Sequence, residues 1–507
     1  MNSPKIDKSR TPVIIGAAQY TQPKDTINPL DPLGLMIKSG RNAFTDTGKS
    51  EKLQQIIDAV YVISIWGWGY RDAPGALSRA LGLNPSHKLY SSVGGNIPQY
   101  LVNTAARAIA RGESRAVFIA GGEAEYSLRR AKREGIKLSW PEKEVLEYSE
   151  SEKTYYVSDI EKKYCIVQAI DAYAVIETAL RHAMGRDHRQ HFSHSGRLLE
   201  KFSRLSSENP DAWKKEYISA EKISAITAEN RYLNYPFIKN FVSNISVDQS
   251  AAVIITNEDI ADRLEVPAGH RVYPMGGADA ENIFYLIQRP ILYDSPPLKE
   301  ASRLSLEQAG LTLNNISAFD IYSCFPCMIE IAIREIGILE NDTRDITLTG
   351  GLPFFGGPFN SYSLHAIVSA VNRIRDNPCQ KIMVQANGGI NTKQSVGIYG
   401  SGPSANPWSG RDDLAVKNSI IGKAMPEPAN KAEGKFTVEG YTIFFDRQGK
   451  PEKCVTVGRL ENGSRALAII PPESRVLEKF EEVDFVGMAG DVTFNTEKGL
   501  NSLNLNL

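Results

Sequence analysis

Cysteine is scarce in this 507-residue chain, and the five cysteines stand at positions 165, 324, 327, 379 and 454. Such a sparse, odd-numbered set does not build a disulfide framework, so we expect a reducing compartment. The chain also has no apolar run approaching the roughly 20 residues of a membrane helix. Its first residues, MNSPKIDKSR, lack the apolar stretch of a secretory signal. We therefore expect a cytoplasmic protein without a membrane span.

An excess of charge of one sign is missing too, since 58 lysines and arginines stand against 59 aspartates and glutamates. Proteins whose main partner is nucleic acid or an acidic membrane carry a basic surplus, which this chain does not have. We expect a metabolic protein that does not bind nucleic acid. Because the length exceeds the size at which one hydrophobic core keeps growing, we expect roughly two to four domains.

Two segments of the chain run from several apolar residues straight into a Gly-Gly pair. They are AVFIAGGEAE at 116–125 and KIMVQANGGIN at 381–391. Each predicts a buried parallel strand that ends where the backbone must come close to another group. Because the same pattern occurs twice, we expect a duplicated α/β fold with a site between its halves.

Strand-like and helix-like segments alternate through most of the first 400 residues, which is typical of βαβ units in a covered, largely parallel sheet. The expected strands, besides the two Gly-Gly segments, are 12–18, 59–64, 88–93, 251–256, 271–276, 318–322, 346–351 and 396–399. The expected helices include 32–47, 99–111, 297–309 and 362–376. Between about 123 and 246 the alternation is lost, which predicts an inserted loop domain.

The C-terminal part has a different pattern. Residues 402–416 are rich in Pro, Ser and Gly and predict a linker. After it, alternation with a period of two and hairpin signals at 446–450 and Asn462-Gly463 predict a small antiparallel β-barrel over 417–507. The α/β halves are then expected at 11–256 and 268–401.

Three motifs resemble the thiolase superfamily: GGEAEYS at 121–127, FSRLSSENPDAW at 202–213 and VDQSAA at 247–252. Sterol-carrier-type thiolases are the most similar branch, over about residues 11 to 401. The β-rich C-terminal part, in place of a sterol carrier domain, is similar to that of thiolase-like proteins of type 1. The resemblance implies two halves packed into a five-layer αβαβα body. It also implies an acyl-CoA thioester as ligand, a role in lipid metabolism and no cofactor besides the CoA of the substrate.

The catalytic side chains of the family are absent from the matching positions. In the family a cysteine nucleophile opens the helix after the third strand, where the helix dipole lowers its pKa. Here Gly95 or Asn96 occupies that place, Leu352 replaces the histidine base and Ala386 replaces the second cysteine. Losing nucleophile and base together removes the route of classical thiolysis. As a structural interpretation, the glycines make a tight turn and Asn96 caps the helix.

Other groups remain for binding or catalysis at these positions. The expected catalytic side chains are Tyr322, His365 and Asn387. The expected oxyanion donors are the backbone N–H groups of Gly95, Asn96, Gly388 and Gly389. The expected substrate contacts are Tyr362, Cys324, Arg129 and Arg130, the two arginines as a grip on a CoA phosphate or simply as an exposed helix face.

Other features carry less weight. Ser91 and Ser92 are alternative nucleophiles, but they lie on the strand side of the corner. We interpret the histidines at 182, 188, 191 and 194 as a solvated basic helix and expect no metal site, because no cysteine or carboxylate set completes one. The CxxC spacing of Cys324 and Cys327 has no second pair, so redox and zinc roles are not expected.

Two classes of function stay open. The first is an enzyme acting on an acyl-CoA, as an acyltransferase of the acetyl-CoA acetyltransferase family or as a carbon–carbon lyase. Because thiolase-like aldolases of steroid side-chain breakdown use tyrosines in similar segments, Tyr322 also fits a tyrosine-dependent retro-aldolase. The second is a noncatalytic acyl-CoA-binding scaffold. The sequence leaves both a monomer and a homodimer open.

Overall fold

The first β-sheet has five strands in the order β1-β7-β4-β2-β3. The computed structural model describes residues 7–144, 156–408, 418–446 and 448–505. Within them, the strands of this sheet are β1 (Pro12–Thr21), β2 (Ala59–Val62), β3 (His87–Tyr90), β4 (Ala116–Ala124) and β7 (Asp248–Asn257). The Gly-Gly strand β4 lies parallel to β2 and antiparallel to β7.

The second sheet repeats this arrangement in the order β8-β11-β10-β9. Its strands are β8 (Tyr273–Glu281), β9 (Ala318–Ile321), β10 (Ile382–Gly388) and β11 (Lys393–Gly400). The second Gly-Gly strand, β10, is parallel to β9 and antiparallel to β11. The predicted duplication is therefore confirmed, and each Gly-Gly strand has one parallel and one antiparallel neighbour.

The predicted strand at 346–351 is wrong. The segment lies along β9 through two backbone hydrogen bonds, from Phe319 N to the Asp345 oxygen and from Ile321 N to the Ile346 oxygen. It then leaves the sheet, because Gly350 and Gly351 have φ of 105° and 72°, a region that glycine adopts without strain. The chain continues as a π-helical turn over Gly351–Phe355.

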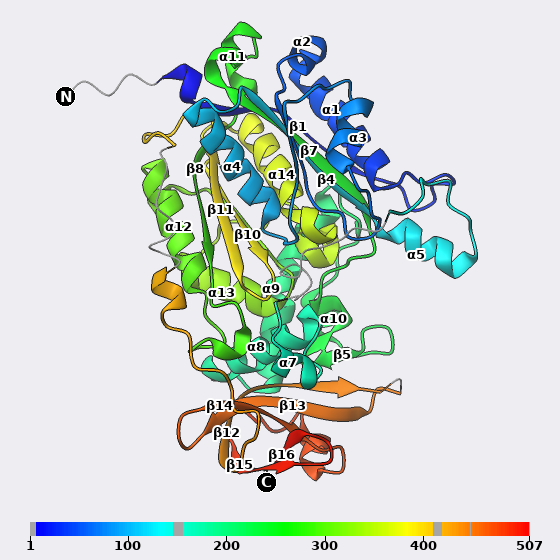
Figure 1. The fold of residues 1–507 in the computed structure, drawn as a ribbon, viewed down its shortest axis with the longest axis vertical. Helices are drawn as coiled ribbons and strands as arrows, with labels where there is room; N and C mark the ends of the chain where they lie inside the picture. The colour runs from blue at the N-terminus through cyan, green and yellow to red at the C-terminus, as the bar shows by residue number, and fades with distance from the viewer. Residues whose placement is uncertain (1–6, 145–155, 409–417, 447, 506–507) are drawn as a thin grey trace, which may run out of the picture.

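Helices complete the five layers seen in Figure 1. The central layer consists of α4 (Ile97–Arg111) and α14 (Tyr362–Asp376), which contact strands of both sheets. The first sheet is covered outside by α1 (Pro32–Thr47) and α3 (Ala73–Ala80). On the outer side of the second sheet, α12 (Pro296–Ala309) packs on β8 and β11, with α13 (Pro326–Ile336) beside it. Two short helices, α2 (Ser50–Gln54) and α11 (Glu258–Arg263), lie at the periphery.

The inserted region lies mostly below this body in Figure 1. Its elements are α5 (Glu125–Glu134), α7 (Asp159–Lys163), α8 (Ala169–Ala183), α9 (His188–Glu208), α10 (Ala220–Ser224), β5 (Tyr232–Tyr235) and β6 (Phe237–Ile238). In Figure 1, α7 to α10 lie between the five-layer body and the C-terminal strands, while α5 projects to one side. Residues 145–155 of the expected loop domain lie outside the described residues.

The C-terminal part is a closed five-stranded barrel, as predicted. Its strands are β12 (Gly434–Phe445), β13 (Pro451–Leu460), β14 (Arg465–Ile470), β15 (Ala489–Asn495) and β16 (Leu500–Leu505). Pairing of β13 with β12 closes the order β13-β14-β16-β15-β12. Four of its five strand pairings are antiparallel, and β14 and β16 pair in parallel. Positions 409–416 of the expected linker, and 417, 447 and 506–507 of the expected barrel region, lie outside the described residues.

The barrel is joined to the inserted region by a shared sheet and by helix α8. Strand β5 pairs with β12, so that Tyr235 lies opposite Ile443. Thr178 of α8 donates its hydroxyl to the Tyr441 oxygen and accepts from the Tyr441 nitrogen, both at 2.9 Å. A Cβ on Gly440 would lie 2.8 Å from the carbonyl oxygen of Val175, so the barrel strand touches the helix backbone.

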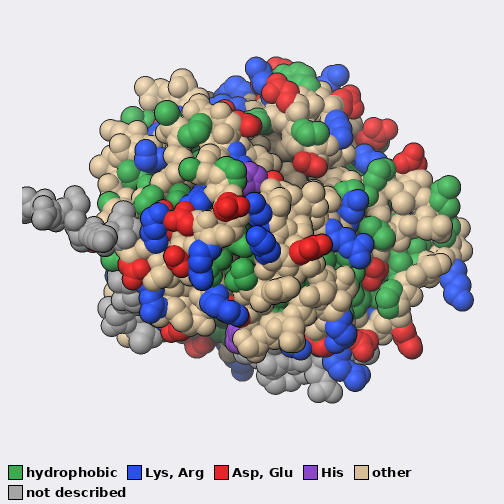
Figure 2. All heavy atoms as spheres, turned by 90° about the horizontal axis from the view of Figure 1, so that it is seen from above, with side chains coloured by type: hydrophobic (Ala, Val, Ile, Leu, Met, Phe, Trp, Pro, Cys, Tyr) green, Lys and Arg blue, Asp and Glu red, His purple; other side chains and the backbone are tan. Residues whose placement is uncertain are grey.

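Charges of both signs alternate on the end of the molecule opposite the barrel, where Figure 2 shows lysine, arginine, aspartate and glutamate side chains intermixed. This face has no broad patch of one sign, in keeping with the balanced composition. Among the helices in the described ranges, none combines the length and the apolar character needed to cross a bilayer.

Replacing Thr178 with valine should destabilise the protein by about 1–3 kcal/mol, because the buried N–H and carbonyl of Tyr441 lose their shared partner. Thr178→Ser keeps the hydroxyl and is the matched control. Denaturant unfolding of both variants measures the difference. Equal stability of the two variants would show that the hydroxyl does not hold the barrel strand.

Candidate functional site

The corner between β3 and α4 meets the end of β10, and its geometry depends on Gly95. A Cβ on Gly95 would lie 2.1 Å from the hydroxyl oxygen of Tyr322 and 2.7 Å from the backbone oxygen of Asn387. No side chain fits in that space. The phenol of Tyr322 therefore fills the position that a side chain at residue 95 would occupy.

Asn96 stands at the start of α4 but does not cap it, so the predicted cap is wrong. Its amide nitrogen donates to Ser395 Oγ at 3.3 Å, while its Oδ1 is buried without a hydrogen-bond partner. A Cβ on Gly388 would lie 2.2 Å from that Oδ1, so Asn96 and Gly388 are in direct contact. Within the described residues, the backbone N–H groups of Gly95 and Asn96 have no acceptor. Both residues are buried, so these are unpaired buried donors at the N-terminus of α4.

Asn387 is fixed by a side chain that sequence reasoning missed. Its Nδ2 donates to the hydroxyl of Tyr173 on α8 at 2.8 Å, and its Oδ1 accepts from Gln394 Nε2 at 2.9 Å. The Tyr173 hydroxyl also donates to the Gly389 oxygen at 3.1 Å and accepts from Asn391 N at 2.7 Å. Asn387 is thus a positioned group, and nothing in the local sequence around Tyr173 signals this contact.

Cys324 lies beside this network, with its Sγ 4.0 Å from Nδ2 of Asn387. Burial raises the pKa of the Cys324 thiol to about 12. The thiol is therefore protonated at neutral pH and is a poor nucleophile. Cys324 and Cys327 are both free and buried.

Tyr322 and Tyr362 pack edge to face, with ring centroids 5.6 Å apart and an interplanar angle of 86°. The Tyr362 hydroxyl donates to Asp320 Oδ1 at 3.0 Å. Burial raises the pKa of Asp320 to about 6 and the pKa of both phenols well above their usual value. Both tyrosines are therefore neutral hydrogen-bond donors near pH 7. An aspartate inside the apolar strand AFDIY was the one sequence signal for this buried acid.

His365 lies elsewhere in the core. Its Nδ1 is 2.9 Å from Oε1 of Gln19 on β1, and its ring is 5.2 Å from that of Phe355. The imidazole is fully buried, and burial lowers its pKa to about 3, so it is neutral. Among the described contacts, none joins His365 to Tyr322 or Asn387.

The two arginines expected to bind phosphate have partners within the protein. Arg129 donates to Glu125 at 2.6 Å, one turn earlier on α5. Arg130 donates to the backbone oxygens of Lys24 and Thr26 at 2.5 and 2.7 Å. Both side chains therefore have structural contacts on the projecting helix α5.

The histidines at 182, 188, 191 and 194 are not all exposed to solvent, as their interpretation as a solvated helix would require. His191 is only 1% exposed, and its Nε2 lies 2.7 Å from Oε1 of Glu177 on α8. His182, in contrast, is exposed and pairs with Asp484 of the barrel. The carboxylates that the sequence around the histidines lacks come from other helices.

Ser91, the alternative nucleophile, is hydrogen-bonded to the backbone. Its Oγ accepts from Ser64 N and donates to the Ser92 oxygen, at 2.9 Å each.

Comparison with known proteins gives a family match for the C-terminal part. Residues 415–497 match the model described as "Thiolase-like protein type 1 additional C-terminal domain". Over nearly its whole length, the chain is similar to a monomeric SCP2-thiolase like protein type 1 from Mycobacterium smegmatis. The identity is 29%, the TM-score is 0.85, and 99% of this chain and 100% of that chain are covered.

More distant similarities concern the α/β body. An Ltp2-ChsH2(DUF35) aldolase matches with a TM-score of 0.61 and 16% identity, over 78% of this chain and 98% of that chain, which shows a shared fold. A 3-ketoacyl-CoA thiolase of Pectobacterium carotovorum is 25% identical over 133 residues, or 26% of this chain and 32% of the relative. The chain thus spans about a third of the length of the curated relatives it matches.

Gly95→Ala should destabilise the protein by about 1–3 kcal/mol, because its methyl group would overlap the Tyr322 hydroxyl. Tyr322→Ala should cost about 3–5 kcal/mol by leaving a cavity. If the two groups compete for one space, the double variant loses clearly less than the sum of the single losses. Additive losses in denaturant unfolding would mean that the two residues do not share that space.

Proposed function

We infer that this chain, a thiolase-like protein with the type 1 additional C-terminal domain, binds an acyl-CoA or related thioester at the α4 corner without classical thiolysis. One observation carries this proposal: the Tyr322 phenol fills the space of a side chain at Gly95, where the family's nucleophile is expected. No acyl group can be transferred to a side chain at that position. The curated relatives that the chain matches are 3-ketoacyl-CoA thiolases, which supports a CoA thioester as the ligand class.

The backbone supports carbonyl binding. The unengaged N–H groups of Gly95 and Asn96 stand at the start of a 15-residue helix, whose dipole favours partial negative charge. A thioester carbonyl oxygen there would accept two hydrogen bonds. The Tyr322 hydroxyl, neutral at pH 7, would be a third donor from the other half of the fold.

A second candidate is a carbon–carbon lyase of retro-aldol type. It is favoured by the position of Tyr322 at the corner, backed by Tyr362 and its hydrogen bond to Asp320. A phenol that donates a hydrogen bond to the thioester carbonyl stabilises the enolate released when the adjacent carbon–carbon bond breaks. In this case the same groups would bind the substrate and assist the reaction.

Removing one backbone donor should weaken thioester binding while leaving the fold intact. Asn96 has φ of −77°, which proline can adopt, so Asn96→Pro deletes its N–H at little conformational cost. We expect about a three- to tenfold loss of affinity for acetyl-CoA or a longer acyl-CoA in calorimetric titrations. Asn96→Ala removes the side chain but keeps the N–H, and should retain affinity. The proposal fails if the wild type gives no binding heat with any thioester.

The lyase candidate is tested separately with Tyr322→Phe, which removes the hydroxyl and little else. A lyase should lose about 10²- to 10⁴-fold in turnover of a β-hydroxyacyl-CoA while binding persists. If the wild type binds thioesters but releases no cleavage product from them, the lyase candidate is rejected and the binding function stands.

A further inference from the structure

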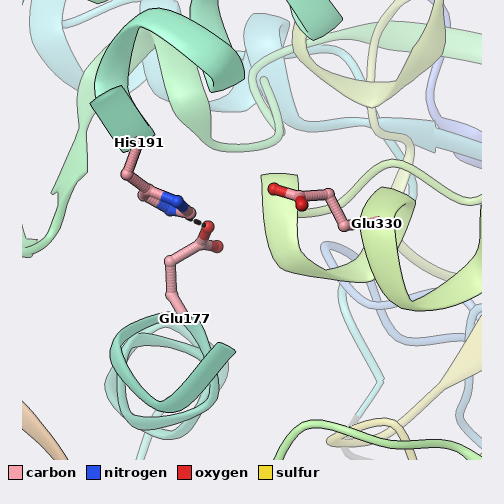
Figure 3. Close-up of side chains that lie close together, drawn as sticks. All are labelled: Glu177, His191 and Glu330. Atoms are coloured by element: carbon pink, nitrogen blue, oxygen red, sulfur yellow. Dashed lines mark hydrogen bonds and ion pairs between the residues drawn. The ribbon is translucent and has the colours of Figure 1, made fainter. Parts of the chain in front are cut away.

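Three buried side chains from three different helices form a compact cluster away from the α4 corner. Glu177 of α8, His191 of α9 and Glu330 of α13 each offer a ligand atom, and these atoms lie within 4.8 Å of one another. The exposed fractions are 1%, 1% and 6%. Figure 3 shows Glu177 bonded to His191, with the Glu330 carboxylate turned toward the imidazole from the other side.

The hydrogen bonds around the cluster account for all but one carboxylate oxygen. Glu177 Oε2 accepts from Cys327 N at 2.8 Å, and Oε1 lies 2.7 Å from His191 Nε2. Glu330 Oε2 accepts from Arg186 at 2.7 Å and lies 3.4 Å from His194 Nε2. Glu330 Oε1 is buried without any partner. A buried, unpaired carboxylate oxygen is costly, so this atom needs an explanation.

The protein partners of Glu330 lie on one of its two oxygens only, since Arg186 and His194 both contact Oε2. No nitrogen of His191 comes within 4.0 Å of a Glu330 oxygen, so the imidazole pairs with Glu177 and not with Glu330. A cation between these side chains would pair with both.

We propose that Glu177, His191 and Glu330 bind one divalent first-row cation, with Zn²⁺ or Mn²⁺ as the best matches. Imidazole nitrogen and carboxylate oxygen are ligands of these ions. The expected ligand atoms are Glu177 Oε1, His191 Nε2 and Glu330 Oε1. Small shifts of these side chains would bring all three atoms to bonding distance from one ion. Three protein ligands leave a position for water or for a second carboxylate oxygen.

The role of this cation is structural. It would link α8 and α9 of the inserted region to α13, which follows β9 of the second half. Tyr173 lies one turn before Glu177 on α8 and holds Asn387 through its hydroxyl. The cation therefore fixes the distance between the inserted region and the α4 corner.

The full-length protein is treated with EDTA, dialysed and titrated with Zn²⁺ against a competing chelator dye. We expect one Zn²⁺ ion to bind per protein chain and the melting temperature of the protein to rise. Glu330→Gln keeps an oxygen for Arg186 but loses the anionic ligand, and should weaken binding by more than the roughly 10- to 100-fold typical of second-shell changes. Glu340→Gln, the same change on an exposed side chain, is the control and should bind like the wild type.

Two further measurements keep the test decisive. Co²⁺ should give a visible d–d absorption in the wild type that is absent from His191→Asn, a variant whose folding is checked by near-UV circular dichroism. If Glu330→Gln fails to fold, His191→Asn supplies the comparison. The proposal is overturned if the metal-depleted wild type neither binds Zn²⁺ stoichiometrically nor gains stability, or if both variants bind it as tightly as the wild type.

Discussion

Helix α8 is buried around most of its circumference, and the need to pair its polar side chains links three parts of the molecule. Tyr173, Glu177 and Arg181 follow one another at intervals of four residues and therefore share one face. Tyr173 contacts the end of β10, Glu177 contacts α9 and the start of α13, and Arg181 bonds to Tyr441 of the barrel. Each of these polar groups would be costly to bury alone. The body, the inserted region and the barrel can therefore form this arrangement only together.

The α4 corner is shaped by groups from both halves of the duplicated fold. Gly95 and the start of α4 belong to the first half, and the Gly388-Gly389 turn belongs to the second. The Tyr322 phenol, also from the second half, lies against Gly95. A side chain at residue 95 would require Tyr322 to change as well, because the two side chains would fill the same space. Gly95 and Tyr322 therefore constrain one another across the two halves.

The sequence alone predicted those features that depend on local pattern. The duplicated α/β fold and the terminal barrel follow from periodicity, Gly-Gly strand ends and hairpin signals, and they are confirmed. The strand expected at 346–351 failed because two glycines turn the chain out of the sheet, and the cap expected at Asn96 failed because its side chain bonds to Ser395. The burial of His191 and the contact of Tyr173 with Asn387 were out of reach, since their partners are far away in the chain. The catalytic roles assigned to Tyr322, His365 and Asn387 stay predictions.

The pairing of β5 with β12 has a consequence for the order of events during synthesis. Residues 232–235 leave the ribosome long before 434–445 exist, yet they share one sheet. Until the last part of the chain is made, β5 has one strand edge without its final neighbour, and Arg181 lacks Tyr441 and Asp484. Contacts this distant in sequence form slowly, because a long loop must close first. The nascent protein therefore passes through a stage in which the inserted region is incompletely assembled and β5 presents an unpaired strand edge.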